Sequence, residues 1–289
     1  SRNARHHYDL SAEMYRLFLD ADMQYSCGYF ETGGEDLETA QAAKKRHIAA
    51  KLCIEPGMRV LDIGCGWGGM AIYLAKECGA RVVGVTLSPE QRRIAEERAR
   101  AAGVADRVSF LEQDYRSVEG PFDRVVSVGM FEHVGVAHYD AFFRKLRALL
   151  ADDGIALLHT IARRNGPSAT NAFIRKYIFP GGYSPAISEI VPPIERTRMF
   201  INDIEVWRDH YGHTLRHWRE RFAANRDKAA ALYDERFCRM WEFYLATAEL
   251  SFTRGSHIIA QLQLSKDRAA VPRTRNYIEA WESRHPISG

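Results

Sequence analysis

The chain has 289 residues, of which 46% are hydrophobic and 27% are charged, and its formal net charge is +3 at pH 7. This composition can bury one large core, and it excludes a protein built to bind polyanions such as nucleic acids. Because no apolar run could span a bilayer, no secretory signal pattern is present and the five cysteines form no C-x-x-C pair, we expect a cytoplasmic protein without disulfides or a metal site.

Short β-branched runs alternate with helical stretches between residues 57 and 162. Ser88 and Pro89 open one of these helices, with Ser88 as the N-cap and Pro89 at the first helical position. Strands separated by helices predict right-handed crossovers and a mostly parallel sheet that helices cover on both faces. The expected strands are 59–63, 81–87, 108–113, 122–128 and 155–161, and the expected helices begin near residues 69, 88 and 137.

The alternation ends after residue 161, and the next clear strand is 258–264. So long a connection is unusual unless it forms a functional cap. It holds a stretch rich in glycine and proline, 179–185, and then amphipathic helical sequence from Asp203 to Phe252. We therefore predict one α/β domain with a doubly wound, mostly parallel seven-stranded sheet of Rossmann-like type and helical lid insertions. Its expected parts are an N-terminal helical cap (1–55), a cofactor-binding core (56–162), a helical insertion (163–256) and a final strand with the C-terminal tail (257–289).

A glycine-rich loop, Asp62-Ile63-Gly64-Cys65-Gly66-Trp67-Gly68-Gly69, lies where the first strand meets the first helix. Glycines at this point let the backbone turn tightly and approach a ligand closely. Dinucleotide-binding folds place glycines at the same point, so the loop alone does not identify its ligand. Asp62, two residues before the first glycine of the loop, suits the ammonium group of a methionine moiety better than a diphosphate.

Polar residues at the ends of the next two strands sharpen this prediction. Thr86 ends the second strand and Gln91 follows it, and both could hydrogen-bond ribose hydroxyls. Gln91 could instead close the capping box of its helix, and we favour the ribose. Asp114 ends the third strand, where it could accept a hydrogen bond from an adenine amino group. Because neither Thr86 nor Gln91 is the acidic residue expected beside an NAD ribose, the sequence favours S-adenosylmethionine over a nicotinamide dinucleotide.

Further motifs follow one another along nearly the whole chain. They are His7-Tyr8-Asp9-Leu10-Ser11, Tyr25-Ser26-Cys27-Gly28-Tyr29-Phe30, Thr86-Leu87-Ser88, Gly129-Met130-Phe131-Glu132-His133-Val134-Gly135, Leu158-His159-Thr160-Ile161, Lys176-Tyr177-Ile178-Phe179-Pro180-Gly181-Gly182 and Arg239-Met240-Trp241-Glu242-Phe243-Tyr244-Leu245. Together with the glycine loop, they resemble the cyclopropane fatty acid synthase family, which includes the mycolic acid cyclopropane synthases. The resemblance implies a class I methyltransferase fold with S-adenosylmethionine as cofactor.

The resemblance also implies roles for individual residues. Family members hold a bicarbonate ion, and its contacts correspond in this sequence to Cys27, Glu132, His159, Ile161 and Tyr244. Their cofactor contacts correspond to Tyr25, Ser26, Gly64, Gly66, Thr86, Leu87, Gln91, Asp114 and Gly129, to which the glycine-loop argument adds Asp62. Bacterial members often carry an additional N-terminal domain, which we do not find in this sequence.

Each expected bicarbonate contact also has a plainer explanation. Cys27 could be a small buried hydrophobe, and Tyr244 could simply pack within a helix. His159 lies in an apolar strand, where a hydrogen-bonded core histidine is the usual outcome, and only the resemblance favours the site. Glu132 is harder to explain by packing, because an unpaired buried carboxylate is costly. We expect the neighbouring His133 to face elsewhere.

The implied reaction is methyl transfer to the cis double bond of an unsaturated phospholipid acyl chain, with bicarbonate removing a proton to close a cyclopropane ring. Tyr25 and Phe131 could offer their π faces to the cation. Three alternatives stay open: a fatty acyl methyltransferase that leaves a methyl or methylene branch, a small-molecule N-methyltransferase, and a non-catalytic lipid-binding protein. The insertion would provide an apolar tunnel for the lipid chain, lined by Phe173, Ile174, Tyr177, Ile178, Phe179 and Tyr183.

The expected partner surface is a membrane, with the protein peripheral to its cytoplasmic side and a homodimer left open. Two basic clusters, Lys44-Lys45-Arg46 and Arg216 with Arg219 and Arg221, could touch anionic lipids. Solvated helix faces are the plainer interpretation of both clusters. Either interpretation places these basic side chains at the protein surface.

Overall fold

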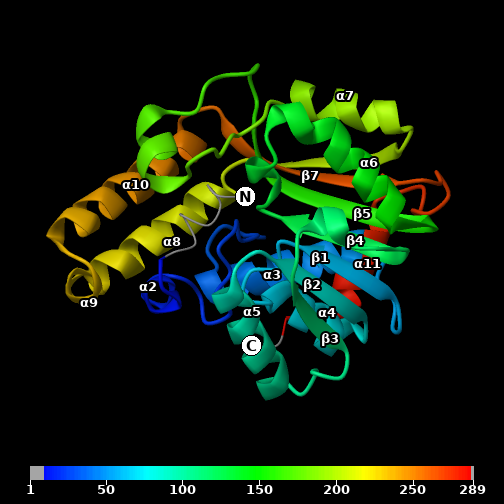
Figure 1. Ribbon diagram of the computed structural model, residues 1–289, viewed down its shortest axis with the longest axis horizontal. Coiled ribbons are helices and arrows are strands. Elements are labelled where there is room, and N and C mark those ends of the chain that lie inside the picture. Colours follow the sequence, from blue (N-terminus) through cyan, green and yellow to red (C-terminus); the bar gives the residue numbers. More distant parts are fainter. Residues whose placement is uncertain (1–9, 288–289) are drawn as a thin grey trace.

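A seven-stranded sheet forms the centre of the computed structural model, which describes residues 10–287 (Figure 1). The strand order is β3-β2-β1-β4-β5-β7-β6. Strands β1 to β5 run parallel, whereas β7 pairs antiparallel with both β5 and β6. The predicted doubly wound, mostly parallel sheet is therefore confirmed. The strands are β1 (Arg59–Ile63), β2 (Arg81–Thr86), β3 (Val108–Glu112), β4 (Phe122–Val128), β5 (Leu150–Arg163), β6 (Phe200–Trp207) and β7 (His257–Ser265).

Helices cover both faces of this sheet, as the alternating pattern predicts. One buried apolar cluster joins one face of the sheet to α3, α4, α5 and α11, and a second joins the other face to α6 and α7. These helices are α3 (Leu37–Lys51), α4 (Gly69–Cys78), α5 (Pro89–Ala101), α6 (Tyr139–Leu149), α7 (Ile187–Thr197) and α11 (Asn276–Arg284). The Ser88 hydroxyl caps α5 by accepting a hydrogen bond from the Gln91 N–H at 3.3 Å, and Pro89 is the first helical residue, as expected.

The remaining helices form a lobe beside the carboxyl ends of the strands (Figure 1). They are α2 (Ala12–Arg16), α8 (His210–Ala224), α9 (Arg226–Leu232) and α10 (Glu235–Thr253). A third apolar cluster holds them together around Trp218 and Trp241, both fully buried. Shorter helical turns connect the elements: η1 (Tyr115–Ser117), η2 (Phe131–His133), η3 (Val136–His138) and the π-helical turn η4 (Ile174–Ile178). The first motif residues His7, Tyr8 and Asp9 lie outside the described residues.

Two predictions about these peripheral segments are wrong. The helical sequence expected from Asp203 onward begins instead with strand β6, because residues 200–207 pair antiparallel with β7, and Asp203 and Glu205 on this strand each form an ion pair with Lys51 at 2.9 Å. Helix α3, expected in an N-terminal cap, packs on the sheet through residues such as Ile48 and Ala49. Short apolar runs fit strand and helix periods alike, so such segments are decided by their tertiary partners.

The basic cluster at residues 44–46 is also not a surface feature. Lys44 is fully buried, Lys45 forms an ion pair with Asp22 at 2.5 Å, and Arg46 pairs with Glu31. The cluster at residues 216–221 stays at the surface, where its arginines pair with Glu249 and Glu38. Over the described part of the chain, no helix combines the length and apolar character that crossing a bilayer requires.

Candidate active site

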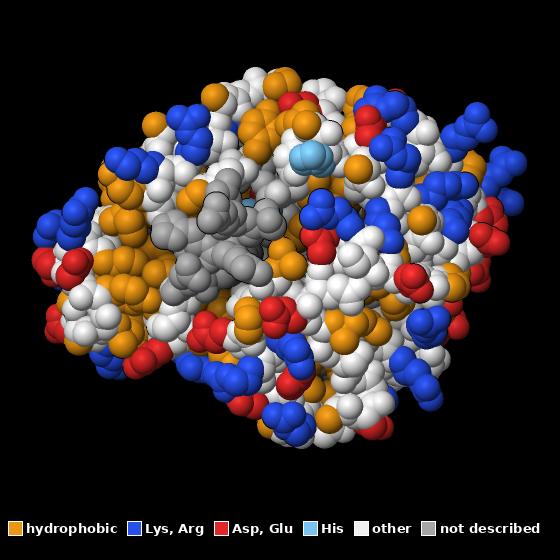
Figure 2. Space-filling model, in the orientation of Figure 1, with side chains coloured by type: hydrophobic (Ala, Val, Ile, Leu, Met, Phe, Trp, Pro, Cys, Tyr) orange, Lys and Arg blue, Asp and Glu red, His pale blue; other side chains and the backbone are white. Residues whose placement is uncertain are grey.

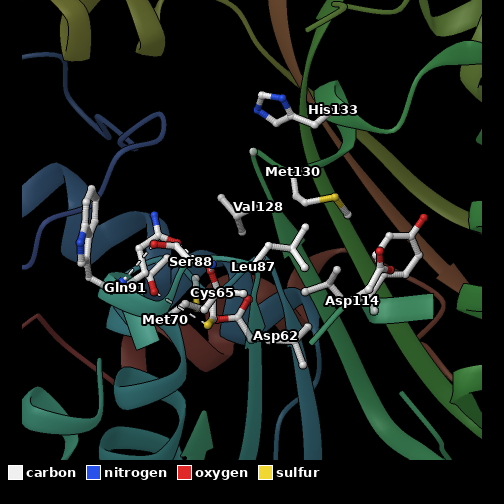
Figure 3. A pocket seen from close by; sticks show the side chains of 18 of the residues that line it. Asp62, Cys65, Met70, Leu87, Ser88, Gln91, Asp114, Val128, Met130 and His133 are labelled. Carbon is white, nitrogen blue, oxygen red and sulfur yellow. Dashed lines mark hydrogen bonds between the residues drawn. The ribbon is translucent and has the colours of Figure 1, made fainter. Parts of the chain in front are cut away.

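A cavity of about 720 Å³ opens at the carboxyl ends of the parallel strands. Figure 3 shows Asp62, Leu87, Asp114 and Val128 around it, one from the end of each of four neighbouring strands. Ligands of open α/β sheets bind in this position. The structure brings together all ten residues that the sequence predicts for the cofactor: Tyr25, Ser26, Asp62, Gly64, Gly66, Thr86, Leu87, Gln91, Asp114 and Gly129.

The glycine loop shapes the floor of this cavity. Gly64 and Gly68 have φ angles of 81° and 84°, in the left-handed region that side chains disfavour. A Cβ atom at Gly64 would lie 2.9 Å from the Cβ of Met130, which follows β4. The loop therefore passes close to the end of β4, and the first turn of α4 begins directly behind it.

Asp62 is the buried acid of the cavity. Its side chain is 2% exposed, and its Oδ2 has no hydrogen-bond partner among the described residues. Burial raises the pKa of Asp62 to about 7, while the positive charge of Lys44 acts in the opposite direction. A buried carboxyl oxygen without a partner is costly, so this position favours a ligand that brings a cationic donor.

The predictions for the residues at the ends of β2 and β3 have different outcomes. The Thr86 hydroxyl donates to Oε1 of Gln91 at 2.8 Å and accepts from the Ser88 N–H at 3.2 Å. Gln91 therefore does not close the capping box, and its side chain stays at the cavity wall. Strand β3 ends at Glu112, two residues before the predicted end at Asp114. Asp114 begins the turn η1, where hydrogen bonds from Arg116 lower the pKa of its carboxyl group.

A second, smaller cavity of about 90 Å³ adjoins the first. Tyr25, Ser26, Gly129 and His133 line both cavities. Four of the five residues expected to contact bicarbonate line the smaller one: Cys27, Glu132, His159 and Ile161. The fifth, Tyr244, lies behind the wall with its hydroxyl 3.3 Å from that of Tyr25.

Glu132 is held in this cavity by one backbone contact. Its Oε1 accepts a hydrogen bond from the Ile161 N–H at 2.6 Å, and its Oε2 has no partner among the described residues. Burial raises the pKa of Glu132 to about 7, and the Ile161 N–H opposes this shift. Near neutral pH, Glu132 therefore carries a proton for much of the time and can donate it to a ligand.

His159 is a neutral hydrogen-bond donor. Its Nδ1 accepts from the side-chain amide of Gln261 at 3.1 Å, so the ring proton resides on Nε2, which has no partner among residues 10–287. Burial lowers the pKa of His159 well below its ordinary value, and the charges of Lys44 and Lys51 add to this shift. Sequence reasoning missed Gln261, whose only signal is a glutamine inside strand β7, and Gln263 on the same strand gives the same signal.

Cys27 belongs to the wall as a thiol. It is fully buried, its Sγ lies 3.2 Å from the carbonyl oxygen of Gly28, and burial raises its pKa. A protonated thiol is a poor nucleophile, so a covalent role is unfavourable. This geometry agrees with a wall or ion-contacting residue.

Two predictions about neighbouring aromatic residues are wrong. His133, expected to face elsewhere, lines both cavities, and Figure 3 shows it among the residues of the larger one. Phe131 is fully buried in the core and stacks on Tyr139 with ring centroids 4.3 Å apart, so its ring does not face the site. The turn η2 explains both outcomes, because successive side chains of such a tight turn point in different directions.

The expected tunnel residues divide into three groups. Ile174, Phe179 and Tyr183 line the smaller cavity. Phe173 and Ile178 pack against the apolar core of the helical lobe. Tyr177 is 45% exposed. The long connection therefore closes over the smaller cavity, and only part of it contributes to the wall.

The parallel sheet with its antiparallel edge, the glycine loop and the strand-end cavity define the class I fold of S-adenosylmethionine-dependent methyltransferases. Solved structures share this fold closely. The chain resembles the cyclopropane synthase MmaA2 from Mycobacterium tuberculosis with a TM-score of 0.87 and 32% identity, over 92% of this chain and 98% of that one. It resembles the mycolic acid cyclopropane synthase CmaA1, solved with S-adenosylhomocysteine, with a TM-score of 0.86 and 33% identity, over 91% and 97% of the two chains.

Comparison of sequences gives the family. The family model for mycolic acid cyclopropane synthetase matches residues 1–262. The cyclopropane-fatty-acyl-phospholipid synthase of Escherichia coli K12 is 44% identical over 241 residues, and the cyclopropane mycolic acid synthase 3 of Mycobacterium tuberculosis is 34% identical over 277 residues. The alignments cover 83% of this chain and 62% of the first relative, and 91% and 96% for the second. The chain belongs to the mycolic acid cyclopropane synthetase family.

Proposed function

We propose that this chain transfers a methyl group from S-adenosylmethionine to the cis double bond of an unsaturated phospholipid acyl chain and closes a cyclopropane ring with the aid of bound bicarbonate. One observation carries this proposal. The cofactor cavity adjoins a small cavity in which Glu132 Oε2 and His159 Nε2 lack partners among the described residues. This pairs a place for a methyl donor with a place for a base.

The large cavity fits the proposed cofactor. S-adenosylmethionine supplies an electrophilic methyl group when it is bound. Asp62 would accept from the ammonium group, the glycine loop would allow close backbone contact, and Thr86 and Asp114, which line the same cavity, would offer oxygens to the ribose and adenine. The volume of about 720 Å³ lies within the usual range for sites of this kind.

The small cavity fits a compact anion. Its volume of about 90 Å³ accommodates an ion of a few heavy atoms. Glu132, when protonated, and neutral His159 both offer donors there, so no ionised carboxylate has to face the anion. Bicarbonate would supply a base beside the transferred carbon, and the chain's task is to orient that base and exclude water.

The chain's own groups suit a reaction in which positive charge moves onto the lipid. Attack by the alkene would form a carbon–carbon bond as the bond from the methyl carbon to sulfur breaks, releasing S-adenosylhomocysteine, and the ring would close as the new methyl group loses a proton to bicarbonate. Tyr25 lies at the junction of the two cavities and can offer its ring face to this charge. Phe179 and Tyr183, which line the smaller cavity, exclude water from the same place.

We further propose that the protein works as a peripheral protein at the inner surface of the membrane. Hydrophobic side chains gather over the lobe of α8 and α10 on the face that Figure 2 shows. Phe243 and Leu250 on α10 are 54% and 58% exposed, and the ring of Phe243 contacts Phe173, which with the 45% exposed Tyr177 belongs to the connection that closes the smaller cavity. Exposed aromatic and aliphatic side chains close to basic ones favour an anionic lipid surface.

The test is incubation of the purified protein with methyl-labelled S-adenosylmethionine and vesicles of a mono-unsaturated phospholipid, followed by analysis of the acyl chains. A cyclopropane product gains CH₂, incorporates the label and shows ring protons without olefinic ones. A methylene branch has the same mass but keeps a double bond, and a saturated methyl branch is heavier by two hydrogens. Labelling of soluble amines but not of vesicles would overturn the lipid substrate.

A further inference from the structure

Lys44 on α3 is a buried cation that the proposed reaction does not explain. Its side chain is fully buried, and its Nζ donates to Oε1 of Gln24 at 2.6 Å and to Oγ of Ser26 at 2.8 Å. Both acceptors are neutral oxygens. Within residues 10–287, no carboxylate forms an ion pair with Lys44.

A second buried lysine on the same helix has its positive charge balanced by carboxylates. Lys51, seven residues further along α3, is also fully buried, but it pairs with Asp203 and Glu205 at 2.9 Å each. Burying a charge is costly unless an opposite charge accompanies it. Lys51 satisfies this condition within the fold, whereas Lys44 does not.

The two carboxylates that act most strongly on Lys44, Asp20 and Asp22, make their hydrogen bonds with other groups. Asp20 accepts from the backbone N–H groups of Gln24 at 2.7 Å and Asp22 at 3.1 Å. Asp22 pairs with Lys45 and Arg98 and accepts from the Gln24 side-chain amide at 2.9 Å. Burial lowers the pKa of Lys44 to about 7, which Asp20 opposes only in part. Lys44 therefore has no carboxylate in direct contact among residues 10–287, and Asp62, whose pKa its charge lowers, lies on the large cavity with one oxygen unpartnered.

The two acceptors of Lys44 stand between it and the large cavity. Ser26 and Gln24 both line that cavity. An ammonium group only donates, so the Ser26 oxygen accepts from Lys44 and its own hydroxyl proton must point elsewhere. The Ser26 carbonyl is occupied separately by the Gln41 amide at 2.8 Å. Lys44 thus polarises a hydroxyl at the cavity wall and orients it as a donor.

We propose that Lys44 is a positioning residue that supplies, through the Ser26 hydroxyl, the positive charge that recognises the carboxylate of the cofactor's amino-acid end. This inference rests on the proposed function. Asp62, on the same cavity, would take the ammonium group of that end. The amino-acid end is a zwitterion, and the cavity then offers one charge of each sign to match it.

The experiment compares two ligands by calorimetry on the full chain. S-adenosylhomocysteine carries the amino-acid end, whereas 5′-methylthioadenosine keeps only the nucleoside and the thioether. Lys44→Met should weaken S-adenosylhomocysteine at least about tenfold, as expected for loss of a charge-assisted contact, and leave methylthioadenosine within about twofold. Lys51→Met, the matched control on the same helix, should leave the ratio of the two affinities unchanged.

A second measurement changes the ligand and compares its binding to the wild type and to two variants. Replacing the carboxylate of S-adenosylhomocysteine by a carboxamide should cost a similar factor in the wild type and little in Lys44→Met or Ser26→Ala. Equal loss of both ligands in Lys44→Met, or an unchanged affinity for S-adenosylhomocysteine, would overturn the role of Lys44. If the wild type binds neither ligand, the proposed function itself fails, and this result is distinct from the others.

Discussion

The two adjoining cavities are built in different ways. The larger one is assembled mainly from short local segments at the ends of parallel strands, such as the glycine loop after β1 and Thr86 at the end of β2, together with residues 23–26 before α3. The smaller one joins elements far apart in the chain: Cys27 before α3, Glu132 in η2, His159 in β5 and Gln261 in β7 behind it.

This difference explains how each cavity obtains its polarity. In the larger cavity, backbone geometry and strand-end side chains present groups that a ligand can meet directly. In the smaller cavity, burial raises the pKa of Glu132 and lowers that of His159, and contacts inside the fold hold both side chains while Oε2 and Nε2 have no partner among the described residues. Changes in the smaller cavity should therefore affect chemistry more than cofactor affinity.

The largest expected effect is on turnover. Glu132→Gln keeps the shape of the side chain but removes its acid–base function, so the rate of ring formation should fall about 10³-fold at constant bicarbonate. Affinity for S-adenosylhomocysteine, measured by calorimetry, should change less than about twofold because the cofactor contacts lie in the other cavity. Glu97→Gln on the exposed face of α5 is the control and should leave both quantities unchanged. Full ring-forming activity of Glu132→Gln would contradict the assignment of the chemistry to the smaller cavity.

An intermediate effect is expected on stability. Burial raises the pKa of Glu132 to about 7, so the native state binds its proton more tightly than the unfolded chain does. Its contribution to stability is present below the ordinary carboxyl pKa of about 4.3 and is lost as the pH rises through 7.

The difference in Tm between Glu132→Gln and wild type should therefore shift in favour of the variant as the pH rises from 5 to 8.5, because only the wild type has a carboxyl group to ionise at this position. The expected gain is about 5 °C in Tm, from a free-energy difference of roughly 3 kcal/mol. Differential scanning calorimetry at both pH values measures it. A Tm difference that does not vary with pH would mean that the carboxyl group titrates normally.

The smallest expected effect is on kcat, and it tests whether Gln261 acts through its hydrogen bond to His159 or only through packing. Gln261→Glu should accept from Nδ1 of His159 and move the ring proton away from Nε2, so that the cavity loses a donor. We expect kcat to fall about tenfold, as for loss of one oriented donor, with a smaller fall in Gln261→Leu. Nitrogen NMR of His159 reports the tautomer directly.

Gln263→Leu is the matched control for this pair. Gln263 is equally buried on the same strand but donates to the Tyr277 hydroxyl at 2.8 Å, away from the cavity. The Gln263→Leu substitution should destabilise the fold without changing the tautomer of His159. If Gln261→Leu and Gln261→Glu reduce kcat equally and the tautomer stays the same, Gln261 acts only through packing.

The sheet and the strand-end residues follow from local patterns, and the structure agrees with most of them. The order of strands and helices from residue 57 to 162, the N-cap at Ser88 and the left-handed glycines depend on neighbours in sequence, which hydrophobic periodicity and turn chemistry report directly. The prediction that Glu132 and His159 lie beside one cavity rested on family resemblance rather than on periodicity. A buried polar residue gives the same sequence pattern whether it binds a ligand or a neighbouring side chain.

Short-range spacing along the chain encodes the sheet, the glycine loop and the ligand class that the strand ends favour. Packing between distant segments fixes which way His133 and Phe131 face, makes residues 200–207 a strand, and buries Lys44 without an ion-pair partner in the described part of the chain while Lys51 is paired. These outcomes depend on contacts between distant segments, and the cost of burying an uncompensated charge becomes apparent only when those segments meet.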